Sequence, residues 1–331
     1  MAGFPHRQPE RYLRAMLPES SRICVFCTLL LTVLQGGCSE GREIEPLPES
    51  ESASAPTELT SDGAERIHER SLVFLSQDGD SSLVLPLSFR TFVRGTTTTR
   101  EAGAWLGLEG EWELMALDSA AGETLAVPFR TLPTRRIRIV VGDEGALEAL
   151  LVRDSLHRVD VRAGINLQSW VGTTGEALTL RRASTGLPEE ESAGFLLDLN
   201  LQDPASRDWI FLEGGDGFQA VLVQDRDDGA AASYQGWGRV AVRDVRWSEL
   251  TVEWDEVLAF ERARRDIPVR WALATPEGDL SGTLESIGAH LTALEGEGPL
   301  LPLSAWFHVR GELDVAGEAF EVTGVIRHRQ R

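Results

Sequence analysis

Residues 305–328 read AWFHVRGELDVAGEAFEVTGVIRH, and their pattern decides the fold class. Two stretches rich in β-branched and aromatic residues, 305–315 and 319–328, flank the turn sequence Val-Ala-Gly-Glu at 315–318. Apolar strand-forming runs on either side of a short glycine-containing turn are typical of a β-hairpin. The segment therefore predicts two long antiparallel strands.

Similar strand-like runs recur from residue 71 onward. In FLLDLNLQ (195–202) the leucines and the polar residues alternate, which places them on opposite faces of a strand. Glu-Gly-Gly-Asp-Gly (213–217) has the composition of a hairpin turn. Ala146–Arg153 is the best helical candidate and fits a strand equally well. The predicted strands are 71–75, 82–93, 112–117, 136–141, 147–152, 158–163, 194–201, 208–213, 218–225, 238–247, 250–257, 269–276, 305–315 and 319–328.

So many strands at close spacing indicate an all-β barrel or sandwich. The body is longer than one ordinary eight-stranded barrel, and GLPEEESAG (186–194) has the composition of a linker. We therefore expect two β lobes, over 71–186 and 194–331. A single large twisted sheet system stays open as the alternative.

The first 37 residues have the order of a secretory signal peptide. Arginines precede the apolar run Ile23–Leu34, and two glycines follow it. The run of about a dozen residues is too short to cross a hydrocarbon core, which needs about 20. Met16 is an alternative start to Met1, because the leader before the run is long.

The segment Leu34-Gln35-Gly36-Gly37-Cys38 resembles a bacterial lipoprotein cleavage box. That resemblance implies a lipid on Cys38, and Ser39 after it implies the outer membrane, facing the periplasm. It departs at Gln35, where an aliphatic residue is usual, so a signal peptide cut near Gly37 is the alternative. We expect residues 38–70 to form a flexible tether, because its Glu-, Pro- and Ser-rich beginning offers little apolar surface to bury.

Composition excludes several classes of function. The 32 basic residues are all arginine, which removes Schiff-base chemistry and a phosphate-loop lysine. The formal net charge of −20 disfavours nucleic-acid partners. The three cysteines, Cys24, Cys27 and Cys38, all lie in the leader region, so the body has neither a disulfide nor a thiol nucleophile.

Motifs for catalysis, cofactors and metals are also missing from the sequence. It contains no Gly-x-Ser-x-Gly elbow, phosphate loop or dinucleotide fingerprint, so we expect no cofactor. The aspartates of Asp-Arg-Asp-Asp-Gly (225–229) indicate a solvated loop, because the closing glutamate of a calcium loop is absent. A turn at Ala316-Gly317 would place His308 opposite Val325 and leave His328, at best, a diagonal neighbour. We expect no metal, although a histidine pair with further ligands remains an alternative.

Tryptophan is the more suggestive residue type in the second half of the chain. Buried indoles usually pack in cores, and the alternative is a cavity lined by aromatic side chains. The six tryptophans concerned are Trp209, Trp237, Trp247, Trp254, Trp271 and Trp306.

Scattered residues in this half resemble the lipocalin-like hydroxyneurosporene synthase/AttH group. They are Phe195-Leu-Leu-Asp-Leu-Asn-Leu201, Glu213-Gly-Gly-Asp-Gly-Phe218, Ala232-Ser-Tyr-Gln-Gly-Trp237, Pro268-x-x-Trp271-x-Leu-x-x-Pro276, Trp306-x-x-Val-x-Gly311 and Val322-Thr-Gly324. The resemblance implies paired β-barrel lobes, and some members of the group hydrate carotenoid double bonds. The sequence departs from the group at Gln235, where a tyrosine is usual, and after 324, where the usual tryptophan and acidic residues are absent.

These observations lead to one main hypothesis and two alternatives. The main hypothesis is a lipid-anchored cell-envelope protein that binds a hydrophobic small molecule or lipid in a barrel-like cavity lined by Trp237, Trp271 and Trp306. The first alternative is a lyase or isomerase of the carotenoid-hydratase type, which needs a buried carboxyl group with a raised pKa. The candidates for that group are Asp198, Asp216 and Asp244. The second alternative is a non-catalytic structural lipoprotein, and we expect absence of enzymatic activity rather than its presence.

Overall fold

A computed structural model describes residues 66–330, with short gaps at 79–80, 124–135, 143–146, 155–157, 173–174, 187–190, 203–206, 226–232 and 297. The predicted signal peptide over 1–37, Cys38 and the tether up to residue 65 lie outside the described residues. The chain from Ser52 to Arg331 forms one compact unit by its internal contacts. No helix in the described part of the chain is long and apolar enough to cross a membrane.

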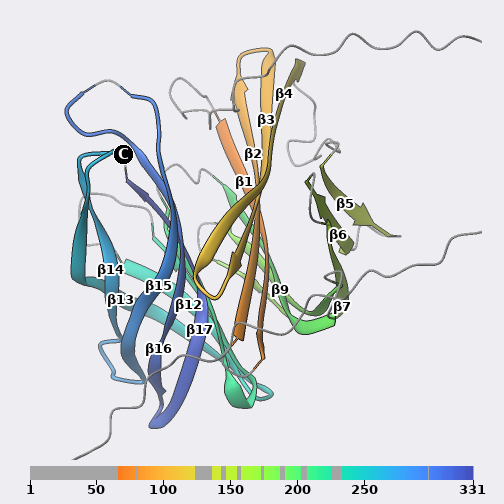
Figure 1. The fold of residues 1–331 in the computed structure, drawn as a ribbon. Helices are drawn as coiled ribbons and strands as arrows, with labels where there is room; N and C mark the ends of the chain where they lie inside the picture. The colour runs from red at the N-terminus through yellow and green to blue at the C-terminus, as the bar shows by residue number, and fades with distance from the viewer. Residues whose placement is uncertain are drawn as a thin grey trace, which may run out of the picture. The chain divides into compact units, whose positions relative to one another are not determined.

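Nine antiparallel strands form the first sheet (Figure 1). Their order across the sheet is β4-β3-β2-β1-β9-β8-β7-β6-β5, so β4 and β5 are its edges. The strands are β1 (Arg66–Asp78), β2 (Ser81–Arg94), β3 (Thr97–Leu108), β4 (Glu111–Glu123), β5 (Ile137–Val141), β6 (Leu147–Arg153), β7 (Arg158–Val171), β8 (Ala177–Gly186) and β9 (Glu191–Gln202).

Eight antiparallel strands form a closed barrel. Each strand pairs with the next along the chain, and β10 closes the barrel by pairing with β17. A short 3-10 turn, η2 (Gly215–Gly217), joins the first two. The strands are β10 (Trp209–Gly214), β11 (Phe218–Gln224), β12 (Ser233–Val240), β13 (Arg243–Phe260), β14 (Arg265–Ala274), β15 (Leu280–Ala293), β16 (Leu303–Val315) and β17 (Glu318–Gln330).

The all-β prediction and the two predicted turns are confirmed. In the final hairpin His308 pairs with Val325, and Ala305 pairs with His328, as the turn at Ala316-Gly317 requires. The segment 213–217 connects β10 to β11. Residues 147–153 form strand β6, which decides between the helix and the strand expected there.

The division between the two sheets lies later in the chain than predicted. Strand β9, predicted to belong to the second lobe from residue 194, pairs with both β1 and β8 of the first sheet. Strand β1 begins at Arg66, so the last residues of the predicted tether are part of the sheet. The pairing of β1 with β9 joins segments more than 100 residues apart, and such long-range pairing leaves no mark in local composition.

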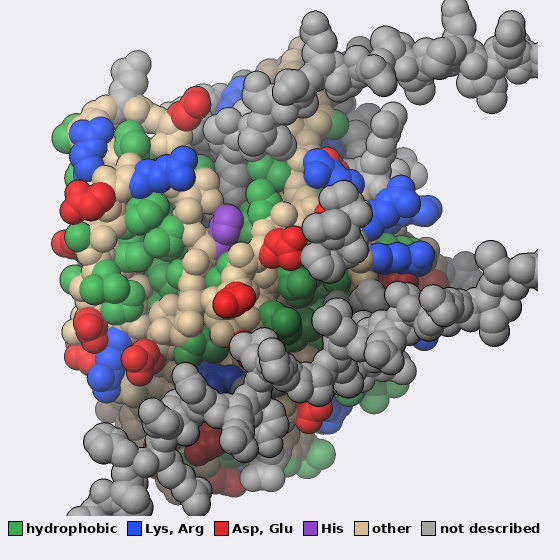
Figure 2. All heavy atoms as spheres, viewed as in Figure 1, with side chains coloured by type: hydrophobic (Ala, Val, Ile, Leu, Met, Phe, Trp, Pro, Cys, Tyr) green, Lys and Arg blue, Asp and Glu red, His purple; other side chains and the backbone are tan. Residues whose placement is uncertain are grey.

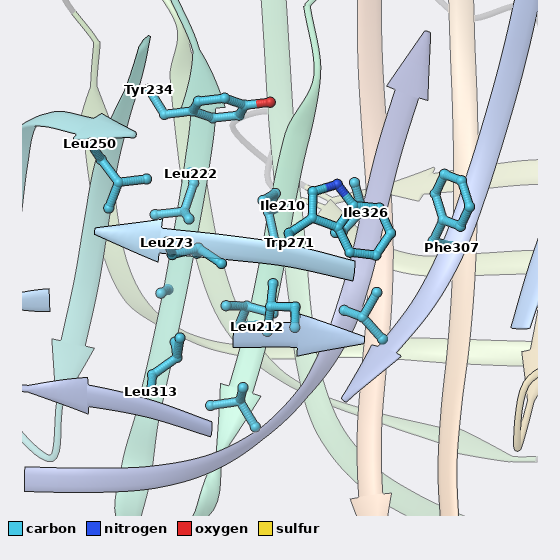
Figure 3. Close-up of a cluster of buried hydrophobic side chains, with 14 of the residues drawn as sticks. Ile210, Leu212, Leu222, Tyr234, Leu250, Trp271, Leu273, Phe307, Leu313 and Ile326 are labelled. Carbon is cyan, nitrogen blue, oxygen red and sulfur yellow. The ribbon is translucent and has the colours of Figure 1, made fainter. Parts of the chain in front are cut away.

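Apolar side chains fill the interior of the barrel (Figure 3). Inside the barrel, Trp271 of β14 and Phe307 of β16 meet edge to face, with ring centroids 5.2 Å apart. Gly236 and Gly238 make room for Trp247, because a Cβ atom at either glycine would lie 2.6 Å from its indole ring. The inward direction of these glycines also fixes the outward direction of Trp237 between them, since successive side chains of a strand alternate.

Two further apolar clusters involve the nine-stranded sheet. One covers a single face of that sheet and includes Leu72, Phe74 and Leu87. The other is shared between the opposite face of the sheet and the outer face of the barrel, and includes Val73, Trp209 and Trp306. We call this second set the shared cluster. It joins the two sheets through a desolvated interface.

A close approach of two backbones adds to that interface. Gly110, in the turn between β3 and β4, lies against Ile287 and Gly288 of β15. A Cβ atom at Gly110 would lie 2.3 Å from the carbonyl oxygen of Ile287, and one at Gly288 would lie 1.7 Å from that of Gly110. Strand β15 carries a register irregularity between Ser286 and Gly288, at this point of contact. Both positions therefore require glycine.

Candidate ligand-binding site

An open pocket of about 320 Å³ lies between strand β7 of the first sheet and strands β12 and β13 of the barrel. Trp237 forms its apolar wall from the barrel, and Trp170 forms the corresponding wall from β7. Trp237 is buried and Trp170 is half-buried. The lining residues are Gln168, Ser169, Trp170, Val171, Trp237, Asp244, Val245 and Arg246.

Charged and polar side chains surround these indoles. The guanidinium carbon of Arg246 lies 5.9 Å from the ring centroid of Trp237, within the range of a cation–π contact. The side-chain amide of Gln168 donates a hydrogen bond to Asp244 at 2.5 Å. Arg239, which pairs with Asp244 across the β12–β13 ladder, donates to the carbonyl oxygen of Leu167 at 3.1 Å. These polar contacts hold β7 against the barrel beside the pocket.

The three predicted cavity tryptophans do not share one site. Trp237 lines the pocket, whereas Trp271 packs inside the barrel. Trp306 lies in the shared cluster, 5.4 Å from Trp105 and 5.5 Å from Trp209 between ring centroids. Trp254 is 48 % exposed on β13. Strand direction explains the division, because Trp237 and Trp306 point out of the barrel and Trp271 points into it.

The carboxyl groups proposed for a hydratase have different surroundings. Asp198 accepts two hydrogen bonds from Arg70, at 2.9 and 2.7 Å, so it is neutralised by an ion pair. Asp244 lines the pocket and is exposed. The side chain of Asp216 lies outside the described residues.

Among the described residues, the carboxyl group with a raised pKa is that of Glu213, which is not one of the candidates predicted from the sequence. Burial raises its pKa from 4.5 to about 8, against the opposing effect of the positive charge on Arg182. Its Oε2 atom is buried and has no hydrogen-bond partner in the described part of the chain. The signal in the sequence was the alternation in Asp-Trp-Ile-Phe-Leu-Glu, which places Glu213 on the same strand face as Trp209 and Phe211.

Glu213 on β10 is separated by strand β11 from β12, the nearest barrel strand that lines the pocket. It pairs with Gln219 on β11, which in turn pairs with Arg239 on β12, the neighbour of Asp244. At about 4.8 Å between adjacent strands, this places its backbone about 10 Å from that of Arg239. A polar row therefore crosses the outer face of the barrel from Glu213 to the edge of the pocket.

His308 and His328 lie on opposite faces of the last hairpin. His328 contacts Phe307 of the barrel interior and is hydrogen-bonded through Nδ1 to Asp208. His308 instead points toward the first sheet, with Nε2 2.9 Å from Ser82 Oγ. No group of three His, Cys, Asp or Glu side chains suited to a metal ion occurs among the described residues.

Ser82 and His308 are not arranged as a nucleophile and its base. The backbone N–H of Gly110 donates to Nδ1 of His308 at 3.3 Å, so Nδ1 carries no proton. Burial lowers the pKa of His308 to about 4, and the ring is therefore neutral near pH 7. The single proton then lies on Nε2 and is donated to Ser82, the reverse of what activation of a serine requires. This contact links the two sheets.

Comparisons with known proteins agree with this fold. No protein-family model matches the chain, and no curated protein matches it either. Among solved structures, an AttH-like protein from Nitrosomonas europaea is 11% identical, with a TM-score of 0.54 over 85% of this chain and 98% of that one. Kievitone hydratase from Nectria haematococca follows with 12% identity, a TM-score of 0.49 and coverage of 78% and 87%. CghA with bound Sch210972 has a TM-score of 0.42 at 10% identity, over 79% of this chain and 88% of that one.

This likeness defines the class of fold, a two-sheet AttH-like β protein.

Proposed function

We propose that the protein binds a small amphipathic molecule with a planar apolar part in the pocket between Trp170 and Trp237. The observation that carries the proposal is the pocket itself, whose volume of about 320 Å³ lies at the lower end of the range for ligand sites. Two indoles provide apolar walls for a planar group. Arg246, Asp244 and Gln168 provide polar groups that would fix its orientation.

This proposal moves the site predicted from sequence. The barrel interior, where a cavity was expected, is filled by buried side chains such as Trp271, Leu284 and Phe307. We therefore place the ligand outside the barrel, against β7.

Binding can be tested with 1-anilinonaphthalene-8-sulfonate, which carries an apolar ring system and an anionic group. We expect saturable binding at one site and energy transfer from tryptophan to the probe. Trp170→Ala should weaken binding about tenfold or more, because truncation of an aromatic residue at the centre of a binding site costs about 2 kcal/mol or more. Trp254→Ala is the matched control, since Trp254 is exposed on β13 and is not among the pocket residues. Equal affinity of Trp170→Ala and the wild type would refute the proposal.

A second candidate function rests on Glu213. A carboxyl group with a pKa of about 8 is protonated at neutral pH and could donate a proton to an alkene, the first step of a hydration. A ligand in the pocket would have to extend along the polar row to reach it. The test is incubation of the co-purified ligand with wild type and Glu213→Gln. If the wild type alone adds one water molecule to the ligand, the result supports a hydratase. If neither protein changes the ligand, the hydratase proposal is refuted and only the binding proposal stands.

We also propose a lipid anchor at Cys38 in the cell envelope, supported by the cleavage-box resemblance of Leu34–Cys38. Mass spectrometry of the protein purified from its own membranes tests the anchor through the mass of the N-terminal peptide. An unmodified N-terminus at a residue other than Cys38 would contradict it. The same preparation would report any co-purified ligand.

A further inference from the structure

Arg100 on strand β3 is a buried cation that the protein leaves without acceptors. Its side chain is 8 % exposed, and neither Nε nor Nη2 has a hydrogen-bond partner among the described residues. No other arginine in the described part of the chain has two buried nitrogen atoms in this state. Buried donors on a charged group normally find acceptors, because leaving them unmet is costly.

The face of the sheet on which Arg100 lies follows from the strand register. Ala102, two residues further along β3, belongs to the apolar cluster confined to the nine-stranded sheet, so Arg100 points to that same face. Thr91 of β2 and Ala120 of β4 lie directly opposite Arg100 on its two sides. Of these two neighbours, Ala120 is small and exposed.

Other arginines of this chain show what the free atoms of Arg100 can bind. Arg70 directs Nε and Nη2 to the two carboxylate oxygens of Asp198, and Arg158 does the same with Asp160 at 3.0 Å for each bond. The Nε–Nη2 edge of a guanidinium matches the spacing of carboxylate oxygens and forms two parallel hydrogen bonds with them. Arg100 presents this same edge with the carboxylate missing.

Asp118 restricts which anion fits. It lies diagonally from Arg100 on the same face, because it pairs with Ala102. Its Oδ1 accepts from Arg136, while its Oδ2 is buried without a partner. A second carboxylate so close disfavours a phosphate dianion. A monocarboxylate is favoured, and a hydroxyl group on the same ligand could donate to Oδ2 of Asp118.

We propose that the Nε–Nη2 edge of Arg100 binds the carboxylate of an organic monocarboxylic acid. This site belongs to the nine-stranded sheet and is separate from the pocket at Trp170 and Trp237. The two can therefore be tested one by one.

The probe is octanoate labelled with ¹³C at its carboxyl group, titrated into the full chain and observed by NMR. We expect saturable binding and a lowered pKa for the bound carboxyl, because an adjacent guanidinium favours the charged form. Octan-1-ol has the same tail without the charge and should not compete.

Three variants separate recognition from folding. Arg100→Gln should bind octanoate at least about tenfold more weakly, the loss expected for charge-assisted hydrogen bonds. Arg100→Lys keeps the charge but not the two-donor edge and should bind with intermediate affinity. Arg158→Gln is the matched control, because it removes the same edge at an exposed ion pair, and it should bind as the wild type does. Thermal unfolding would confirm that all three are folded.

Equal octanoate affinity of Arg100→Gln and the wild type would overturn the proposal. Absence of saturable binding up to about 10 mM octanoate, above the millimolar range of weak specific ligands, would also overturn the proposal. Ordered water would then be the explanation for the unpaired donors of Arg100. The sulfonate probe should still bind Arg100→Gln at the other pocket. Failure of one site therefore does not imply failure of the other.

Discussion

Replacement of Glu213 by glutamine should make the protein more stable, and the gain should grow with pH. In the folded state burial raises the pKa of Glu213 from 4.5 to about 8, so the native protein holds a proton that the unfolded chain releases. Wild-type stability is therefore favoured below pH 4.5 and declines as pH rises to about 8. Glutamine has the shape of the protonated acid and no charge to desolvate.

The size of the effect follows from the pKa difference. One pKa unit corresponds to about 1.4 kcal/mol, so the stability advantage of Glu213→Gln should increase by about 4 kcal/mol between about pH 5 and about pH 9. Urea unfolding at these pH values and at pH 7 measures it directly. Glu318→Gln is the matched control, because this carboxyl group is exposed in the last hairpin. A stability difference for Glu213→Gln that does not change with pH would refute the protonated state of Glu213.

Three other predictions test the rest of the structure. The folded-state pKa of His308 is lowered to about 4, so the wild type should lose stability as pH falls from 6.5 toward 4. His308→Gln should remove this loss. Urea unfolding across that pH range checks it, and an unchanged pH dependence in the variant would contradict it. Trp271→Ala should destabilise the barrel by about 3–5 kcal/mol, because Trp271 is buried, whereas Trp254→Ala at an exposed position should cost less than about 1 kcal/mol. Equal effects of the two substitutions in thermal unfolding would show that the interior is not packed around Trp271. Glu69→Gln should cost about 3–5 kcal/mol, since the buried carboxylate is surrounded by Arg90, Arg327 and Arg329, and a neutral effect in denaturant unfolding would argue against that network.

Local features of this fold could be predicted from the sequence, because their causes are local. The pairing of His308 with Val325 follows from a short turn at Ala316-Gly317 and strict alternation on both sides. The all-β class follows in the same way from many short alternating runs.

Features that depend on distant segments could not be predicted. The assignment of β9 to the first sheet depends on its pairing with β1, and no turn or composition signal records that contact. The site was only partly predictable for the same reason. Trp237 was identified, but its partner Trp170 lies on β7 of the other sheet, and the two become neighbours only through the packing of the sheets. Glu213 and Arg100 are notable for buried side-chain atoms without hydrogen-bond partners, a property of the folded surroundings rather than of residue type.

The contact between Gly110 and Gly288 sets a condition for any attempt to exchange one sheet of this protein for that of a relative. The two backbones touch where neither position can accept even a methyl group, and His308 accepts a hydrogen bond from Gly110 while contacting Ser82. A chimaera that takes the barrel from one protein and the nine-stranded sheet from another must therefore inherit all four positions as a set. Grafts that carry only one side of the contact should fail to assemble, even when each sheet alone is compatible with its own core.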